Sequence, residues 1–406
     1  MESKQITAIS TRTAGDGGRT GIPSKLGLFL LTVLLLPCRP AAARAGQDGD
    51  GGVPYVGSAG CSSSSCHGGG GTTRSEYTRW SKSDFHHERP FATLTTARAA
   101  RIAGNLKISD PALDARCTAC HAPLQTVPAA RLSQDNQITE GVACENCHAP
   151  AQHWLRSHTR KDWTTADRVQ AGMRDLKNLY VRANTCVACH QNVEPATRAA
   201  GHPELIFELD GQLAGEPRHW PKDKDKPGPQ IWLVGQAVAL RETSWQLSGE
   251  TNPEPDLRDQ GQGLLRLLQP LCRVDSHLPA FDAGFLAPHA DHWAAVQRWS
   301  DDFAKAAANL VWSDNLTRRC LDHLIGTRET FADNSLPAPA QARFAERLVL
   351  GLDRLITGLA PLYADARLNQ SMNLLFSDVQ SLPDFAPASF VTDLTEFHRN
   401  LAGLSP

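Results

Sequence analysis

The second half of the chain carries apolar side chains at the spacing of an amphipathic α-helix. Between residues 236 and 406 they recur near three-, four- and seven-residue intervals in two clear stretches. These positions are Trp293, Val296, Phe303, Ala307 and Leu310, and then Phe344, Leu348, Leu352, Leu355 and Leu359. Proline-containing breaks at residues 252–255 and 336–339 divide the region. We therefore predict a bundle of four to six helices, with the tryptophans and leucines as its core.

Residues 46–235 show little long helical periodicity, and residues 51–75 are rich in glycine and serine. Short helices are expected at about residues 95–105 and after Thr164, where Thr164 to Asp167 resembles a capping box. The whole chain is therefore expected to be mainly α, with little regular sheet. This first region contains too little apolar surface to offset chain entropy by itself, so it needs another source of core.

The N-terminus has the pattern of an export signal. Residues 1–25 are polar and basic, residues 26–36 form an apolar run, and Ala43-Arg44-Ala45 is a small-x-small cleavage site. The run is too short to span a bilayer, which takes about 20 apolar residues. We expect a signal peptide at residues 1–45 and a periplasmic mature protein. An uncleaved anchor, a lipid anchor at Cys38 and peripheral association with a membrane stay open.

Composition narrows the class of protein. The 406 residues are 41% hydrophobic and 21% charged, which excludes a disordered polar chain and a membrane bundle. The net charge of −2, from 41 basic and 43 acidic residues, predicts no nucleic-acid partner. No dinucleotide-binding or Walker-type loop is present. The unusual number is 11 cysteines.

Eight of these cysteines form four short motifs, and each motif ends in histidine. The motifs are Cys61-Ser-Ser-Ser-Ser-Cys66-His67, Cys117-Thr-Ala-Cys120-His121, Cys144-Glu-Asn-Cys147-His148 and Cys186-Val-Ala-Cys189-His190. Such motifs attach haem: two thiols bond the vinyl groups of one porphyrin, and the next histidine offers an axial nitrogen to the iron. The sequence thus predicts four covalently attached haems c, which would also serve as the core of this region.

Zinc and disulfides are the rival interpretations of these cysteines. Two motifs together could form a tetrahedral zinc site. Neither alternative requires a histidine directly after every cysteine pair, whereas haem does. The two cysteines left in the mature chain, Cys272 and Cys320, are expected either to form one disulfide or to be buried thiols.

Residues 54–235 resemble the tetrahaem cytochrome c-554 family of multihaem cytochromes. The similar segments occur in the family's order, at residues 56–58, 80–83, 87–94, 141–148, 154–158, 199–203 and 207–209. The resemblance implies that His87, His158 and His202 are second axial ligands. His86 and His153 are alternatives, and His219 is expected to be structural. A further family histidine is replaced here by Pro195, so one iron could be five-coordinate.

The resemblance implies a tetrahaem domain at residues 46–235, followed by the helical region at residues 236–406. The leading hypothesis is a periplasmic carrier that takes electrons from one redox protein and gives them to another. The alternative is an enzyme that reduces nitric oxide, or a related small nitrogen oxide, at a five-coordinate haem. A structural role with vestigial haems is the third hypothesis.

Overall fold

The computed structural model describes residues 52–220, 226–250, 253–287, 292–332, 336–359, 364–380 and 382–404. All of them belong to one compact unit, Ala45–Pro406. The predicted signal peptide at residues 1–45 lies outside the described residues. None of the helices in the described ranges has the length and apolar character that crossing a membrane requires.

The described chain is mainly helical, as predicted. Its single β-bridge joins Tyr55 to Leu132. The first region holds α1 (Glu76–Ser83), α2 (Arg89–Thr93), α3 (Ala97–Leu106), α4 (Ala115–His121), α5 (Cys144–His148), α6 (Thr165–Gln170), α7 (Leu179–His190), α8 (Pro195–Ala199) and α9 (Leu209–Gly215). The second holds α10 (Gly228–Gly249), α11 (Pro255–Leu271), α12 (Trp293–Asn309), α13 (Asp314–Ile325), α14 (Glu329–Ala332), α15 (Ala338–Thr357), α17 (Ala366–Asp378) and α18 (Pro387–Ala402).

Local sequence sets the ends of several helices. The capping box predicted at Thr164 is present, since its hydroxyl accepts from the Asp167 backbone N–H and the Asp167 carboxylate accepts from that of Thr164. α3 matches the helix predicted at about residues 95–105. The two proline breaks become the first turns of α11 and α15.

The helical region contains more helices in its described residues than the four to six predicted, in part because α13 and α17 begin at polar caps and not at proline. Ser313 caps α13 through a hydrogen bond from the Leu316 backbone N–H. The Asp365 carboxylate caps α17 by accepting a hydrogen bond from the Leu368 backbone N–H. Short polar side chains thus end and start helices within a pattern that looked continuous.

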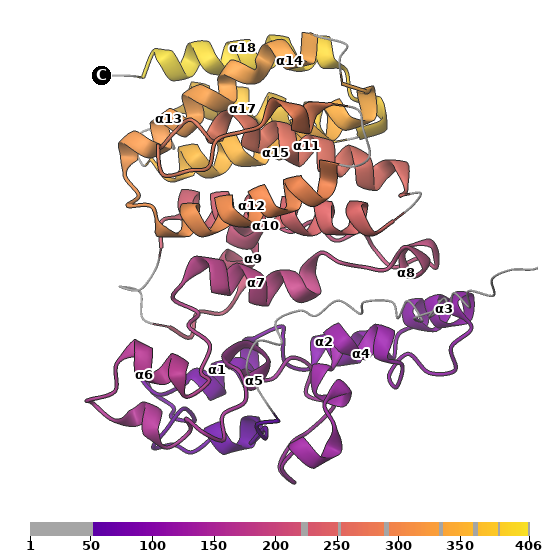
Figure 1. The fold of residues 1–406 in the computed structure, drawn as a ribbon, viewed down its shortest axis with the longest axis vertical. Coiled ribbons are helices and arrows are strands. Elements are labelled where there is room, and N and C mark those ends of the chain that lie inside the picture. The colour runs from indigo at the N-terminus through magenta and orange to yellow at the C-terminus, as the bar shows by residue number, and fades with distance from the viewer. Residues whose placement is uncertain are drawn as a thin grey trace, which may run out of the picture. The chain divides into compact units, whose positions relative to one another are not determined.

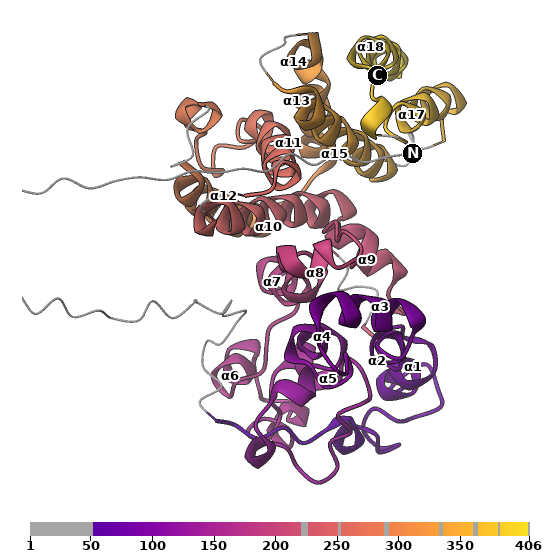
Figure 2. The same cartoon turned by 90° about the vertical axis from the view of Figure 1, so that its right-hand side faces the viewer.

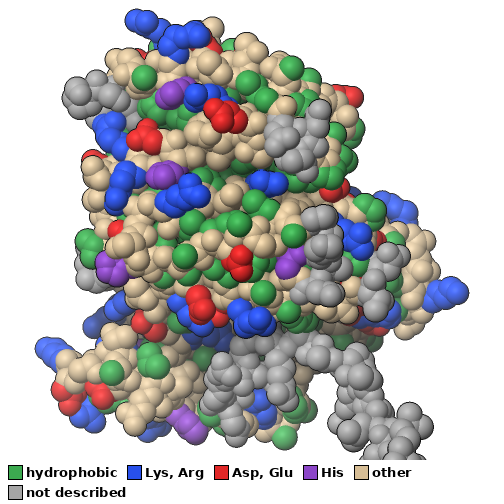
Figure 3. Space-filling model, turned by 45° about the horizontal axis from the view of Figure 1, so that its top comes forward, with side chains coloured by type: hydrophobic (Ala, Val, Ile, Leu, Met, Phe, Trp, Pro, Cys, Tyr) green, Lys and Arg blue, Asp and Glu red, His purple; other side chains and the backbone are tan. Residues whose placement is uncertain are grey.

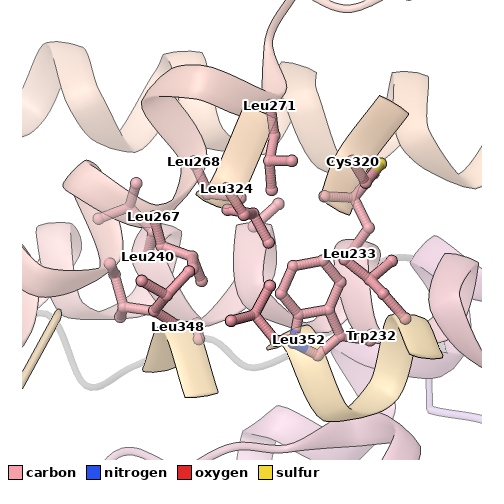
Figure 4. Close-up of a cluster of buried hydrophobic side chains, with 14 of the residues drawn as sticks. Trp232, Leu233, Leu240, Leu267, Leu268, Leu271, Cys320, Leu324, Leu348 and Leu352 are labelled. Atoms are coloured by element: carbon pink, nitrogen blue, oxygen red, sulfur yellow. The ribbon is translucent and has the colours of Figure 1, made fainter. Parts of the chain in front are cut away.

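The core of the bundle lies between α10, α11, α13 and α15 (Figure 4). α10 packs against α12, and α11 against α15. Ten of the buried side chains in this core are Trp232, Leu233, Leu240, Leu267, Leu268, Leu271, Cys320, Leu324, Leu348 and Leu352. Cys320 and Cys272 are both free thiols, and burial raises the pKa of Cys320 to about 12. The apolar side chains are therefore core, as predicted.

α7 and α9 connect the first region to this bundle (Figures 1 and 2). Leu179, Ala183 and Val187 of α7 are buried in the same apolar cluster as Trp232 of α10. The domain boundary that we predicted between residues 235 and 236 falls inside α10, which packs on both α7 and α9. The last cysteine motif is consequently part of a helix held by the bundle.

Buried polar contacts reinforce this connection. The Arg347 guanidinium of α15 lies 2.6 Å from the carboxylate of Glu208, which also accepts from the Gln236 side chain at 2.9 Å. Tyr180 of α7 donates to Asp301 of α12 at 2.7 Å. These contacts help to fix how α7 and α9 meet the bundle, because the loss of a partner at a shielded polar group costs free energy.

Candidate haem-binding site

Three of the four cysteine motifs are helical. α5 consists of the third motif, while the second and fourth motifs end α4 and α7. Cysteines three residues apart on a helix project to the same side, and the following histidine lies one position further round. The first motif, with four intervening residues, begins at the end of a 3₁₀ turn, Ser58–Cys61. Its longer spacing replaces the helix by a loop.

Polar side chains at the start of these helices fix where the motifs begin. Asp114 caps α4 and accepts from the Arg116 backbone N–H, while Asn178 caps α7. Asn146 accepts from the Ala143 backbone N–H at the start of α5. The helix termini that carry the motifs are therefore specified locally.

Each motif histidine faces a second histidine from a distant part of the chain. The ring centres are 6.1 Å apart in pair 1 (His67 and His158) and 6.4 Å in pair 2 (His121 and His202). They are 6.4 Å apart in pair 3 (His148 and His219) and 6.1 Å in pair 4 (His190 and His86). All eight histidines are thus arranged two by two.

This separation is too long for direct ring stacking and suits an atom held between the rings. A metal bonded to one nitrogen of each ring, at about 2 Å per bond, would place the ring centres roughly 6 Å apart. The same distance recurs in four separate places. The donor chemistry fits haem iron, because each pair includes a histidine that follows two thiols.

Hydrogen bonds occupy Nδ1 of several paired histidines and leave the Nε2 atoms of these rings for a metal. Nδ1 of His121 lies 2.8 Å from the carbonyl oxygen of Pro90, and Nδ1 of His202 lies 2.8 Å from that of Pro203. Nδ1 of His158 lies 3.2 Å from the Trp154 carbonyl oxygen. Such contacts hold metal-binding imidazoles in a fixed tautomer and orientation.

At pairs 1 and 4, a carboxylate oxygen lies beside Nδ1 in place of a backbone carbonyl oxygen. Nδ1 of His67 lies 3.0 Å from Glu76, and Nδ1 of His86 lies 3.0 Å from Asp84. His219 has Nδ1 3.4 Å from the Pro217 carbonyl oxygen and 3.6 Å from Glu216. The carboxylate oxygens of Asp84 and Glu216 and a ring nitrogen of His219 lie within 4.8 Å of one another, so pairs 3 and 4 approach each other there.

Burial favours the neutral form of three motif histidines, His121, His148 and His190. Burial lowers the pKa of His148 to about 4, and the nearby His219 adds to this effect. The pKa values of His121 and His190 are also lowered, mainly by burial. A neutral imidazole has the lone pair that a metal needs, so this environment favours ligation at neutral pH.

Contacts between cysteines give the spatial order of the motifs. The Cys61 thiol of motif 1 lies beside that of Cys144 in motif 3, and Cys120 of motif 2 lies beside Cys189 of motif 4. Cys147 of motif 3 interacts with Cys186 of motif 4. The motifs are therefore neighbours in the order 1, 3, 4, 2, although the chain visits them in numerical order.

Glu145 ties the N-terminal segment to the third motif. This buried carboxylate accepts from the backbone N–H groups of Val56 at 3.1 Å, Gly57 at 2.8 Å and Ala151 at 2.6 Å. Burial raises the pKa of Glu145, and the three backbone donors oppose that effect. One side chain thus joins the loop before motif 1 to the residues that follow motif 3.

The structure brings two of the three predicted distal histidines, His158 and His202, against a motif histidine. The third, His87, packs on Trp80 with ring centres 4.2 Å apart and has Nδ1 3.1 Å from the Ser81 carbonyl oxygen. Its neighbour His86 faces His190 instead. His153 is exposed.

His219, which the sequence led us to regard as structural, faces His148. Counting would have pointed to it only if all four irons were taken to have two histidine ligands, because the resemblance supplied three distal histidines.

Gly141 accounts for the position of His86. The Val142 backbone N–H donates to the His86 carbonyl oxygen at 2.8 Å, so the two segments lie in close contact. Gly141 has a φ of +75°, and a Cβ there would lie 2.5 Å from the same oxygen. Only glycine allows this approach without strain.

One family matches the chain, over residues 60–149, and it is described as cytochrome c554 and c-prime. This match confirms the resemblance found in the sequence. It spans less than a quarter of the 406 residues and covers the first three motifs and His86, but not motif 4, His158, His202 or His219. The comparisons with curated proteins and with solved structures found no match.

Proposed function

Because residues 60–149 match the cytochrome c554 and c-prime family, we propose that this chain is an exported c-type cytochrome with four haems. In this proposal it takes electrons from one periplasmic redox protein and passes them to another. The four facing pairs of histidines carry the proposal. Haem, when bound, supplies a one-electron couple between ferric and ferrous iron.

The chain's own residues would hold this group at each site. The eight motif cysteines would provide covalent attachment: Cys61, Cys66, Cys117, Cys120, Cys144, Cys147, Cys186 and Cys189. His67, His121, His148 and His190 would bind one side of each iron. Their partners His158, His202, His219 and His86 would bind the other side, and the contacts of Nδ1 orient six of the eight rings.

The pairing favours a carrier over an enzyme. An iron with two imidazole ligands has no position left for a substrate. All four motif histidines have a partner in the described part of the chain, which argues against the alternative of nitric oxide reduction at a five-coordinate haem. The mixed surface in Figure 3, with basic and acidic side chains interspersed, agrees with a net charge of −2 and protein partners.

A pyridine haemochrome assay on protein from a host that matures c-type cytochromes tests the number of haems. We expect four per chain, retained after denaturation because they are covalent. Adding nitric oxide or carbon monoxide to the reduced protein tests the pairing, and we expect no rapid spectral change. Colourless protein, or stoichiometric zinc in place of iron, would overturn the proposal, and fast ligand binding at one haem would restore the enzyme alternative.

Export has its own test. N-terminal sequencing of the mature protein from the periplasm should begin close to residue 46. A chain that starts at residue 1 and stays with the membrane fraction would contradict cleavage of the signal.

A further inference from the structure

We propose that Asp84 lowers the reduction potential at pair 4 below that at pair 2, so that electrons move from pair 4 to pair 2. This inference rests on the proposed function and concerns how the chain directs electrons among its four sites. It arises from a difference between the groups that lie at hydrogen-bond distance from Nδ1 of the histidines in two neighbouring pairs.

Asp84 is fixed against His86 by two hydrogen bonds. Its Oδ1 accepts from the His86 backbone N–H at 2.9 Å and lies 3.0 Å from Nδ1 of the same residue. Asp84 is the C-cap residue of α1, and its side chain is only 3% exposed. The carboxylate is thus held in place and shielded from water.

A buried carboxylate in this position makes the metal ligand more electron-rich. An imidazole whose Nδ1–H donates to a carboxylate is a stronger base at Nε2. It then stabilises ferric iron, which has one more positive charge than ferrous iron, and the potential falls. Hydrogen bonding of axial ligands and burial are the means by which a protein sets such potentials.

Pair 2 has neutral groups in the corresponding places. The Nδ1 atoms of His121 and His202 meet the carbonyl oxygens of Pro90 and Pro203, each at 2.8 Å. Partial exposure of His202 to water acts in the opposite direction, because water also stabilises ferric iron. A full negative charge at hydrogen-bond distance from the ligand, on a carboxylate whose own side chain is only 3% exposed, is the stronger influence.

The carboxylate beside motif 2 is already neutralised. Asp114 acts on Cys117, but both of its oxygens accept hydrogen bonds from Arg116, at 2.9 and 2.8 Å. No such cation hydrogen-bonds Asp84 among the contacts of the described residues; its partner is His86. Pair 2 is therefore the more easily reduced of the two sites.

Pairs 1 and 3 fall between these extremes. Glu76 lies 3.0 Å from Nδ1 of His67, but its side chain is 38% exposed and water screens its charge. The nearest carboxylate oxygen to Nδ1 of His219 is 3.6 Å away, beyond a hydrogen bond. The expected order of potentials is therefore lowest at pair 4 and highest at pair 2.

Motifs 4 and 2 are direct neighbours, because the side chains of Cys189 and Cys120 lie beside each other. The largest difference in potential thus occurs across one short step at the end of the order 1, 3, 4, 2. With haem bound, the surroundings of the two pairs would favour transfer of one electron from ferrous iron at pair 4 to ferric iron at pair 2. No bond is made or broken, and an external one-electron donor reduces pair 4 again.

The test is a spectroelectrochemical titration of the holoprotein, with dithionite as the reductant, on two variants and a control. Asp84→Asn should shift the lowest of the four midpoint potentials upward the most, shift that of pair 3 upward by less, because His219 lies within 4.8 Å of the same carboxylate, and leave the other two in place. His202→Met, which puts a thioether in place of one imidazole at pair 2, should raise the highest midpoint. Glu88→Gln removes one exposed carboxylate close to His86 and should shift none.

The outcomes separate this inference from the proposed function. Fewer than four haem midpoints in the wild-type protein would contradict the proposed function itself. Four midpoints, with Asp84→Asn moving none or moving another midpoint further than the lowest, would overturn the role of Asp84. If Asp84→Asn fails to take up haem, His202→Met decides alone, and a shift of any midpoint but the highest refutes the order.

Discussion

His148 and His219 face each other with ring centres 6.4 Å apart, and the buried Nδ1 of His148 has no hydrogen-bond partner among the residues that the structure describes. His148 is also the histidine whose pKa burial lowers to about 4. The orientation of the His148 ring therefore depends on packing and on the group bound at its other nitrogen, Nε2. This makes His219 the partner on which the third site depends.

Replacing His219 by alanine should open one axial position at the third site. Since the thioether bonds are untouched, we expect four haems still attached, with one of the four sites changed from low spin to high spin. The reduced variant should then bind carbon monoxide, which optical spectroscopy detects. His277→Ala, at a histidine whose side chain is 81% exposed, is the matched control and should bind none. A fully low-spin His219→Ala protein would contradict the pairing.

The adjacent histidines His86 and His87 give a sharper comparison. His86→Ala should create a high-spin haem at pair 4, because the ring facing His190 is lost. His87→Ala should leave all four sites low spin, since that ring packs on Trp80 and hydrogen-bonds Ser81. Magnetic circular dichroism or electron paramagnetic resonance of the oxidised proteins distinguishes the two. The reverse result would show that the family pattern, which favours His87, describes the ligand better than the structure does.

The relative orientation of the rings predicts the magnetic signature of each site. The planes of pair 1 are 14° apart, while those of pairs 2, 3 and 4 are 72°, 76° and 86° apart. Parallel imidazoles act on the iron d orbitals along one direction and give a rhombic low-spin spectrum. Perpendicular imidazoles cancel this effect and give a spectrum with one very large g value. We expect one rhombic component and three of the second type, and four equal rhombic signals would contradict these angles.

Haem-attachment motifs and the helical class could be recognised in the sequence because both depend on short-range spacing. Two thiols and a histidine within five residues need no tertiary information, nor do the periodic leucines of α15. The histidines that face the motif histidines differ, since each comes from a separate segment placed by the fold. His86 reaches His190 because Asp84 and Gly141 fix its loop, and no periodicity distinguishes it from His87.

A close backbone approach in the bundle predicts a stability effect. A Cβ at Gly351 of α15 would lie 2.5 Å from the ring of Trp232, which is fully buried in α10. Gly351→Ala should therefore destabilise the bundle by about 1–3 kcal/mol through overpacking. Gly228→Ala, where the added Cβ meets nothing within 4 Å, should stay within about 0.5 kcal/mol of wild type. Denaturant unfolding followed by tryptophan fluorescence measures both, and equal effects would argue against the contact.

Asp378 of α17 and Asp393 of α18 predict how stability depends on pH. Burial, together with the neighbouring Asp393 carboxylate, raises the pKa of Asp378 to about 6. Between the unfolded value near 4 and this folded value, the native state holds a proton that the unfolded chain has lost. Stability should therefore fall as the pH rises from about 4 to about 6, and this part of the slope should end above pH 6.

Asp378→Asn isolates this effect, because the amide cannot ionise and removes the repulsion from Asp393. Thermal unfolding between pH 4 and 8 should show a larger stabilisation by this substitution at pH 7 than at pH 4. Asp322→Asn, on the exposed face of α13, should shift the melting temperature equally at both values. If Asp378→Asn gave the same shift at pH 4 and pH 7, the two carboxylates would not share a proton in the folded protein, and the packing of α17 on α18 would have to place them further apart.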